Sequence, residues 1–352
     1  KVIVKRLASI ENFGSMNVLC SDKTGTLTEG TVQVESALNV YGEANEKVFL
    51  YSYLNAFYET GFTNPIDQAI LKYRKIDLSD YHKHDEIPYD FLRKRLTIAV
   101  GQGDTHLIIT KGALTNILDV CSYAETTDGK IVEIATLQDQ IQKHFAEFSN
   151  KGFRTLGIAY KTLPAAAIIT KNEEKDLTFL GFLTLFDPPK ANITDTINSL
   201  KKLGVSLKVI TGDNHLVAAN LSKKMGLSDK KIITGPKLGH MSDAALVKSV
   251  GMIDIFAEIE PNQKERIIIA MRKAGNVVGY IGDGINDASA LHAADVGISV
   301  DSAADVAKDA ADIVLLEKDL SVLIEGVKEG RMTFANTLKY VFMATTANFG
   351  NM

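Results

Sequence analysis

The sequence predicts an α/β protein in which a doubly wound parallel sheet is interrupted by an inserted, antiparallel α+β domain. Three apolar, β-branched runs each end at a short polar motif and therefore indicate buried parallel strands. The runs cover residues 16–20, 205–210 and 276–281, and the motifs after them are Ser21-Asp22, Thr211-Gly212-Asp213 and Gly282-Asp283-Gly284. Helical patterns alternate with these strands, as a doubly wound sheet requires.

The remaining elements follow from periodicity and turn signals. Around the three runs, helical patterns cover residues 193–203, 215–225, 262–274 and 285–293, and further strands cover 296–300 and 312–316. Between about residues 31 and 183 the pattern changes to short strands at 96–100 and 106–110, joined by a hairpin signal at 101–104. Helices are expected there at residues 44–60, 65–73, 113–120 and 137–150, the last closed by Gly152.

Composition narrows the class of protein. With 352 residues, 45% of them hydrophobic, the chain can bury the cores of two domains. A net charge of −4 provides no general basic field, so nucleic acid is not an expected partner. Cys20 and Cys121 form no CxxC pattern, which favours a reducing cytosol and no structural zinc.

The two ends of the chain suggest a piece of a longer protein. The sequence begins without Met, and Lys5 and Arg6 break its first apolar run, so we expect an excised segment rather than a signal peptide. Residues 340–352 carry no charge but are fewer than the roughly 20 apolar residues that span a membrane. We therefore expect residues 336–352 to begin a stalk or membrane helix that is cut off.

Three acidic residues follow predicted strands directly. In open α/β sheets, ligands bind beyond the carboxyl ends of the strands, at the point where the strand order reverses. Asp22, Asp213 and Asp283 should therefore meet at one edge of the sheet. Three carboxylates at one edge indicate a bound cation.

The most specific signal is DKTGTLT at residues 22–28. A strand-end carboxylate can attack phosphorus in line, while N–H groups of the following turn hold phosphate oxygens. Read alone, the segment could also be a Thr-rich turn capped by Asp22. It resembles the phosphorylation motif of P-type ATPases, in the haloacid-dehalogenase-like superfamily, which implies that Asp22 accepts the γ-phosphoryl group of ATP as an aspartyl-phosphate.

Position 24 separates kinds of enzyme within that superfamily. Hydrolytic members usually carry a second Asp two residues after the nucleophile as a general acid/base, whereas this chain has Thr24. The resemblance then implies a lasting aspartyl-phosphate, hydrolysed with the help of a Glu on a separate actuator domain. The TGE sequence of that domain is not present in these 352 residues.

Residues 282–287, GDGIND, resemble the family's GDGxND signature, with Ser289 where proline is usual. Alone, GDG and ND are also ordinary turn sequences. The resemblance implies that Asp22, the carbonyl of Thr24 and Asp283 hold Mg²⁺, a hard ion that prefers oxygen ligands. Asn286 and Asp287 would orient these ligands, with Asp287 completing the metal site.

Two more motifs of the sheet domain match the family. Thr211-Gly212-Asp213 resembles its TGD, which implies phosphoryl contacts from the Thr211 hydroxyl and the Gly212 N–H, with Asp213 bracing the loop. Lys264 matches the family lysine that stabilises charge on the phosphoryl group. Without the resemblance, Lys264 would read as a solvated lysine in the first turn of a helix.

The predicted insert carries the nucleotide motifs. Lys111-Gly112-Ala113 resembles the family's KGA, which implies that Lys111 lies beside adenine and that Gly112 permits close backbone approach. By the same resemblance, Phe91 stacks on adenine, Arg93 and Arg154 meet ribose or phosphates, and Asp67 lies near adenine. Leu96 departs from the pattern, because many calcium-pump relatives have a nucleotide-contacting lysine there.

Asp187-Pro188-Pro189 resembles the family's DPP hinge, and its prolines make a stiff link beside the nucleotide site. The order of motifs implies a phosphorylation domain at 1–30 and 184–335 and a nucleotide-binding domain at 31–183. DEIPYDFLRKR and the segment from EGRMTFANTLKY to the end most resemble bacterial magnesium-transporting members. This implies ATP and Mg²⁺ as cofactors, a transported cation, and a place at the cytoplasmic face of the cell membrane.

Two other classes of function stay open on the sequence. A free-standing phosphatase of the same superfamily would hydrolyse phosphoesters with turnover, and Thr24 argues against it. A nucleotide-sensing module would keep Lys111 and Gly112 and lose the chemistry, whereas Asp22, Lys264 and Asp283 are all present.

Overall fold

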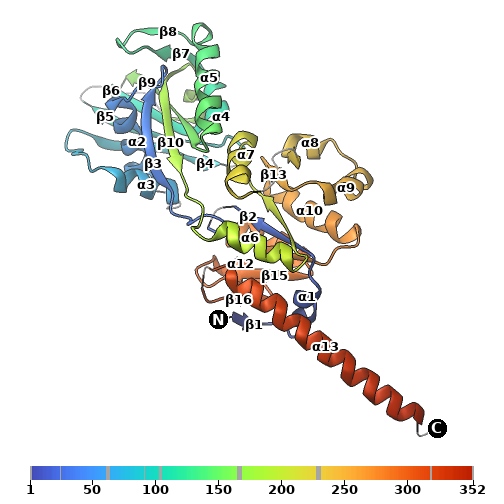
Figure 1. Cartoon of the computed structure of the whole chain (residues 1–352). Coiled ribbons are helices and arrows are strands. Elements are labelled where there is room, and N and C mark those ends of the chain that lie inside the picture. Colours follow the sequence, from blue (N-terminus) through green and yellow to red (C-terminus); the bar gives the residue numbers. More distant parts are fainter. Residues whose placement is uncertain are drawn as a thin grey trace. The chain divides into compact units, whose positions relative to one another are not determined.

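The computed structural model describes residues 2–23, 25–60, 64–90, 92–102, 105–164, 169–226, 231–317 and 319–350, and it is mixed α/β with two multi-stranded sheets (Figure 1). The chain divides into two compact units. The first unit comprises Lys1–Gly30 and Pro189–Met352, and the second comprises Thr31–Pro188. The second unit extends to Pro188 because its last strand continues to Phe186.

The first unit is built on an eight-stranded sheet with the order β1-β16-β15-β14-β2-β11-β13-β12. All neighbouring strands are parallel except β1, which runs antiparallel to β16 at one edge. The strands are β1 (Val2–Val4), β2 (Val18–Asp22), β11 (Ser206–Ile210), β12 (Ile232–Thr234), β13 (Ile255–Ala257), β14 (Val278–Ile281), β15 (Val296–Val300) and β16 (Ile313–Leu315). Residues 18–21 of β2 are all buried, as expected for a strand covered on both faces.

Seven of the helices described in the first unit pack in two groups, while α7 contacts the strands β12 and β13 and α8 contacts β12. One contains α1, α6 and α13, and the other contains α9, α10, α11 and α12. The helices are α1 (Ser9–Ser15), α6 (Ile193–Lys202), α7 (His215–Lys224), α8 (Gly235–Gly239), α9 (Asp243–Ser249), α10 (Pro261–Lys273), α11 (Ala288–Ala293), α12 (Asp305–Ala310) and α13 (Ser321–Gly350), with short 3₁₀ turns at Val250–Met252 and Ile285–Asp287. One hydrophobic core joins these layers to the sheet.

The longest helix, α13, continues past the sheet at its C-terminal end (red in Figure 1). Its residues 331–346 are exposed. Within the described parts of the chain, no helix combines the length and the apolar character needed to cross a membrane.

The second unit contains the other sheet, with the order β4-β5-β6-β9-β10-β7-β8 and with β3 also paired to β10. Its pairs are antiparallel except β7 with β10. The strands are β3 (Gln33–Asn39), β4 (His82–Asp90), β5 (Arg95–Gln102), β6 (Thr105–Ala113), β7 (Cys121–Glu125), β8 (Ile131–Glu133), β9 (Arg154–Pro164) and β10 (Leu177–Phe186).

Side chains of this second sheet alternate between separate hydrophobic clusters. Leu107 and Ile109 of β6 join the cluster that includes α2 and α3, while Ile108 points into another cluster with Ile87. The helices are α2 (Glu46–Tyr58), α3 (Pro65–Tyr73), α4 (Leu114–Leu118) and α5 (Gln138–Asn150), with 3₁₀ turns at Ile134–Thr136 and Lys171–Glu173. Helices α4 and α5 contribute to a third cluster.

Most predicted elements are present. The helix at 65–73 and the strand at 296–300 have the predicted bounds, and Gly152 adopts a positive φ just after α5. The predicted hairpin pairs β5 with β6, although its residues 103 and 104 lie outside the described residues. The helix predicted at 285–293 is divided, because a 3₁₀ turn precedes α11.

Candidate active site

Three polar motifs meet at one edge of the first sheet. Strand β2 lies between β11 and β14, with Asp22 opposite Ile210 and Ser21 opposite Ile281. Thr211 and Gly282 continue directly from these neighbouring strands. The carboxyl ends of three adjacent parallel strands therefore bring their polar residues together.

Asp22 ends strand β2 with its carboxylate held by two donors. The Lys264 ammonium donates to Oδ2 at 2.8 Å, and the backbone N–H of Lys23 donates to Oδ1 at 2.6 Å. The side chain remains 21% exposed, so a ligand can reach it. Burial raises the pKa of the Asp22 carboxyl, and the nearby ammonium of Lys264 opposes this rise.

Lys264 reaches Asp22 from the first turn of α10. Pro261 opens that helix, and the side chains of Glu260 and Gln263 form a capping box. The Lys264 ammonium also donates to Asp287 Oδ1 at 2.7 Å. Burial would lower the pKa of Lys264, but the carboxylates of Asp22 and Asp287 outweigh burial and hold that pKa above its ordinary value.

Asp287 is buried behind this contact, and both of its oxygens accept hydrogen bonds. The Tyr280 hydroxyl donates to Oδ1 at 2.6 Å, and the Gly284 N–H donates to Oδ2 at 3.0 Å. Burial, followed by the charge of Asp287, raises the pKa of Tyr280 well above its ordinary value. Its hydroxyl is therefore protonated and donates to Asp287. Asn286, next to Asp287 in the chain, is exposed.

Asp283 lies against the turn that follows Asp22. A Cβ built on Gly25 would be 2.5 Å from Asp283 Oδ2, and Gly25 has φ +75°, so this position requires glycine. Thr24 lies outside the described residues. The expected set contains three carboxylates, those of Asp22, Asp283 and Asp287, and the Thr24 carbonyl. Within the described part of the chain, however, no three or more His, Cys, Asp or Glu side chains are grouped to hold a metal.

A second buried ion pair supports the same edge. The Lys23 ammonium lies 2.5 Å from Asp213 Oδ2, and both side chains are less than 10% exposed. The Asp213 N–H donates to Thr211 Oγ1 at 3.1 Å. A Cβ on Gly212 would be 3.7 Å from the nearest atom, the carbonyl oxygen of Ile259, so packing within the protein does not require glycine there.

In the second unit, Lys111 of β6 forms a buried ion pair with Asp67 of α3. Asn64 caps α3 and also donates to Asp67. The charge of Lys111 and these hydrogen bonds outweigh the effect of burial and lower the pKa of Asp67. Leu96 is buried and pairs with Lys111 across the sheet, so an apolar side chain stands beside the lysine.

Gly112 allows two strands of this sheet to approach closely. A Cβ there would be 2.5 Å from the Lys94 carbonyl oxygen and 2.6 Å from the Arg95 Cβ. Sheet packing alone therefore excludes any larger residue at position 112.

Arg93 is held within the protein. Its guanidinium pairs with Asp90 and with Glu174, a fully buried carboxylate, and it donates to the Pro88 carbonyl. Phe91 lies outside the described residues. Arg154 is exposed at the start of β9, and Asp187 is half-buried just after β10.

Sequence reasoning missed several polar residues of these sites. Lys23 could have been found, because it belongs to the DKTGTLT motif. Tyr280 and Glu174 carry no local signal, since one lies within an apolar strand and the other beside a charged turn. Their partners are set by tertiary structure alone.

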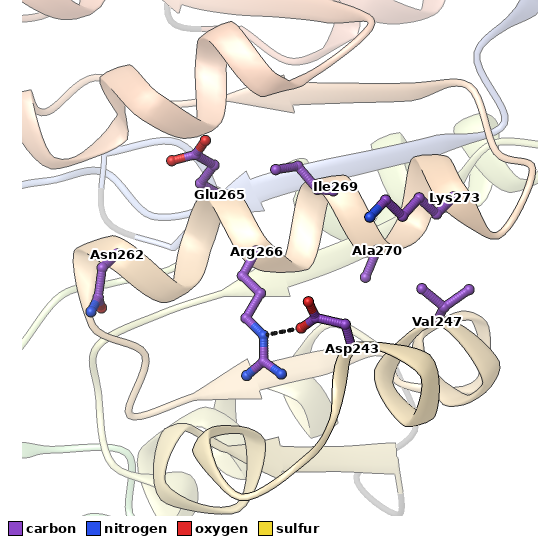
Figure 2. A pocket seen from close by; sticks show the side chains of 8 residues that line it. All are labelled: Asp243, Val247, Asn262, Glu265, Arg266, Ile269, Ala270 and Lys273. Carbon is purple, nitrogen blue, oxygen red and sulfur yellow. Dashed lines mark hydrogen bonds and ion pairs between the residues drawn. The ribbon is translucent and has the colours of Figure 1, made fainter.

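A cavity of about 330 Å³ lies beside α9 and α10 (Figure 2), and Asp22 is not among the residues that line it. Its lining residues are Asp243, Val247, Asn262, Glu265, Arg266, Ile269, Ala270 and Lys273. Of the five buried residues of α10, only Ala270 also lines this cavity, whereas Lys264, Ile267, Ile268 and Met271 do not. An ion pair between Arg266 and Asp243 crosses it at 2.8 Å.

Comparison with known proteins identifies the family. A family model described as P-type ATPase, cytoplasmic domain N, matches residues 9–192. Magnesium-transporting ATPase, P-type 1, of Escherichia coli K12 is 42% identical over 360 residues, which cover 100% of this chain and 40% of that protein. Calcium-transporting ATPase 1 of Bacillus cereus is 31% identical, and the match covers 100% of this chain and 42% of that protein. Calcium-transporting ATPase 1 of Saccharomyces cerevisiae is 33% identical, and the match covers 97% of this chain and 41% of that protein.

The family match covers more than half of the chain, and the chain belongs to the P-type ATPase family. The resemblance drawn from the motifs is thereby confirmed, including its likeness to magnesium-transporting members. The chain spans about two fifths of the length of these relatives.

Proposed function

We propose that this chain is the catalytic cytoplasmic part of an ATP-driven cation pump, in which ATP held by the second unit phosphorylates Asp22. One observation carries the proposal. At the end of the central strand β2, a reachable carboxylate accepts hydrogen bonds from the buried ammonium of Lys264 and from the backbone N–H of Lys23. Membership in the P-type ATPase family supports the same chemistry.

The first unit is proposed to be a haloacid-dehalogenase-like phosphorylation domain, with its second part at residues 184–335. Its sheet is parallel except for edge strand β1, and its polar motifs follow adjacent strands, as in doubly wound folds. Residues 31–183 would form the inserted nucleotide-binding domain. The exposed second half of α13 would lead toward a stalk at residues 336–352.

In the proposed reaction, a carboxylate oxygen of Asp22 attacks the γ-phosphorus in line. The new O–P bond forms as the bond to the β–γ bridging oxygen breaks, and ADP leaves with that electron pair. The Lys264 ammonium, the Thr211 hydroxyl and the Gly212 N–H stabilise the charge that spreads over the phosphoryl oxygens. Asp213 braces this loop through its ion pair with Lys23.

Magnesium fits the oxygen-rich groups beside Asp22. Asp283 lies against Gly25 in the turn after the nucleophile, and carboxylate and carbonyl oxygens are the ligands that Mg²⁺ prefers. Asp22, Thr24 and Asp283 would hold the ion, which supplies positive charge to the phosphoryl oxygens. Asp287 also accepts protein donors on both oxygens, but its side chain is only 2% exposed, against 21% for Asp22. We therefore assign Asp287 to orienting Lys264, and Asn286 to orienting the ligands.

For the nucleotide, we propose a site around the Lys111–Asp67 ion pair, with Gly112 at the closest strand approach and Phe91 stacking on adenine. Arg154 is exposed at the start of β9 and would meet ribose or phosphate there. Arg93 would have to exchange Asp90 or Glu174 for the nucleotide. Asp187 and the prolines after it would form the hinge that delivers the γ-phosphate.

The transported cation and the place in the cell are proposed from the relatives. Because magnesium-transporting relatives are 41 to 42% identical, we propose Mg²⁺ as the transported cation. Membrane helices and an actuator domain would then lie in the rest of the pump, at the cytoplasmic face of the cell membrane. Measuring the ion-stimulated ATPase activity of the whole protein tests whether Mg²⁺ is the transported cation.

Asp22→Asn tests the reaction. An amide cannot attack phosphorus, so we expect acid-stable label from γ-labelled ATP to fall to background. Nucleotide affinity should hold or rise, because two unit charges about 4 Å apart repel by roughly 4 kcal/mol at an effective dielectric near 20. Asp195→Asn, an exposed position on α6, is the matched control and should label like the parent.

Label on the Asp22→Asn variant would assign the nucleophile to another residue and contradict the proposal. Rapid Asp22-dependent phosphate release from a small acyl phosphate, without labelling by ATP, would instead favour a free-standing phosphatase.

A further inference from the structure

Tyr280 is a polar residue in the middle of an apolar, buried strand. Strand β14 reads Val-Gly-Tyr-Ile, all four residues are buried, and Tyr280 is 0% exposed. A buried tyrosine hydroxyl needs a hydrogen-bond partner, since leaving it unpaired costs free energy. Its partner is the carboxylate of Asp287, 2.6 Å away.

That contact belongs to a continuous path to the proposed nucleophile. Tyr280 and Lys264 both donate to Oδ1 of Asp287, at 2.6 and 2.7 Å. Lys264 also donates to Asp22 at 2.8 Å. Two residues, Asp287 and Lys264, therefore connect the Tyr280 hydroxyl with Asp22. Each connection is a short, charge-assisted hydrogen bond.

We propose that Tyr280 is a positioning residue for phosphoryl transfer, and that its hydroxyl fixes Asp287 so that the Lys264 ammonium stays directed at Asp22. This inference rests on the proposed function and adds a residue to it that the family motifs do not contain.

The physical reason is competition for one ammonium group. Lys264 is shared between two carboxylates, and Tyr280 satisfies part of the acceptor capacity of Asp287. Without the hydroxyl, Oδ1 of Asp287 would keep Lys264 as its single donor and would draw the ammonium away from Asp22. Water is poorly placed to replace the hydroxyl, because Asp287 is only 1% exposed.

Small displacements of such a charge matter for catalysis. Electrostatic stabilisation depends on donors already aimed at the position where charge develops. A residue that orients such a donor should affect the rate at saturating substrate more than substrate binding. A merely structural hydroxyl would affect stability and leave both kinetic parameters unchanged.

Tyr280→Phe removes only the hydroxyl and keeps the ring. We would measure the initial rate of Asp22 labelling in this chain over a range of ATP concentrations. The saturating rate should fall about 5- to 50-fold, below the roughly 10²- to 10³-fold loss typical when a direct donor is removed. The half-saturating ATP concentration should change by less than about two-fold, because the proposed nucleotide contacts lie in the second unit.

Tyr160→Phe is the matched control. Tyr160 is buried in the second unit, and its hydroxyl donates to the carboxylate of Glu125. Both variants lose one hydroxyl–carboxylate hydrogen bond, so a general loss of stability would appear in both. Only Tyr280→Phe should slow labelling. In an Asp287→Asn background, Tyr280→Phe should change the rate by less than about two-fold, because its route to Lys264 is gone.

The outcomes separate this inference from the proposed function. If Asp22→Asn is labelled, the proposed function fails and the role of Tyr280 falls with it. If the parent is labelled on Asp22 and Tyr280→Phe keeps the parent's saturating rate, only the role of Tyr280 is overturned. An equal effect of Tyr280→Phe with and without Asp287 would also overturn it.

Discussion

At the scale of single residues, each unit surrounds a buried lysine with carboxylates. Lys264 pairs with Asp22 and Asp287 in the first unit, and Lys111 pairs with Asp67 in the second. Removing one partner of a buried ion pair leaves an uncompensated buried charge, which lowers the free energy of unfolding. Each lysine is thereby held in one place before a ligand arrives.

The site around Lys111 contains a further acid, Glu59, next to Asp67. Burial, the hydrogen bond with Asp67 and the charge of Asp67 raise the pKa of Glu59 to about 8 from an ordinary 4.5. The folded protein therefore keeps a proton that the unfolded chain loses. Between these two values the free energy of unfolding should fall as pH rises, and the contribution of Glu59 should be fully present only below about 4.5.

Glu59→Gln tests this pH dependence. The variant cannot titrate at position 59, so its stability relative to the parent should rise as pH increases from about 5 to about 8.5. Urea denaturation of the second unit at a series of pH values measures the difference. Glu133→Gln, an exposed position in the same unit, is the control and should show no such trend. A constant difference between parent and Glu59→Gln across this range would refute the expectation.

At the scale of elements, helix starts and close strand contacts place the side chains of the two proposed sites. Lys264 and Asp67 both lie in the first turn of a capped helix, α10 and α3. Caps fix the direction in which such a turn begins, and so the direction of its side chains. In the second sheet, Gly112 and Gly181 let neighbouring backbones approach.

Gly181 is the more demanding of these two positions. A Cβ there would be 2.0 Å from the carbonyl oxygen of Leu38 in the neighbouring strand β3. Gly181→Ala should destabilise the second unit by at least about 2 kcal/mol, because β3 and β10 must separate. Gly129→Ala is the control, since that residue has φ +77° and open space around it, and strain alone should cost roughly 1 kcal/mol. Equal losses in chemical denaturation would contradict the packing argument.

At the scale of the whole molecule, the two units have separate hydrophobic cores. The largest cluster of buried residues draws only on the first unit, and the other three draw only on the second. Two cores without shared residues can unfold as independent cooperative units.

We therefore expect two unfolding transitions in calorimetry. ATP should raise the midpoint temperature of the second unit's transition and leave that of the first unit unchanged. A ligand stabilises the unit that binds it by about 2.7 kcal/mol at 100 times its dissociation constant. Lys111→Ala should abolish the ATP shift, whereas Asp22→Asn should keep it. A single transition that ATP shifts as a whole would contradict independent unfolding.

The local sequence was enough to predict the strand-end motifs, the main helices and the family. The reason is that the periodicity of hydrophobic residues and the turn residues are both encoded within short segments. Asp22 and Asp283 were predicted as site residues in this way, whereas Lys264 was predicted from its match to the family lysine. Tertiary structure alone decided which polar groups meet, because their partners are distant in sequence. Lys264 and Asp22 are 242 positions apart, and Arg93 and Glu174 are 81 apart. Tyr280 reads as a core residue until folding brings its hydroxyl to Asp287, since no local pattern encodes where a buried side chain finds its partner.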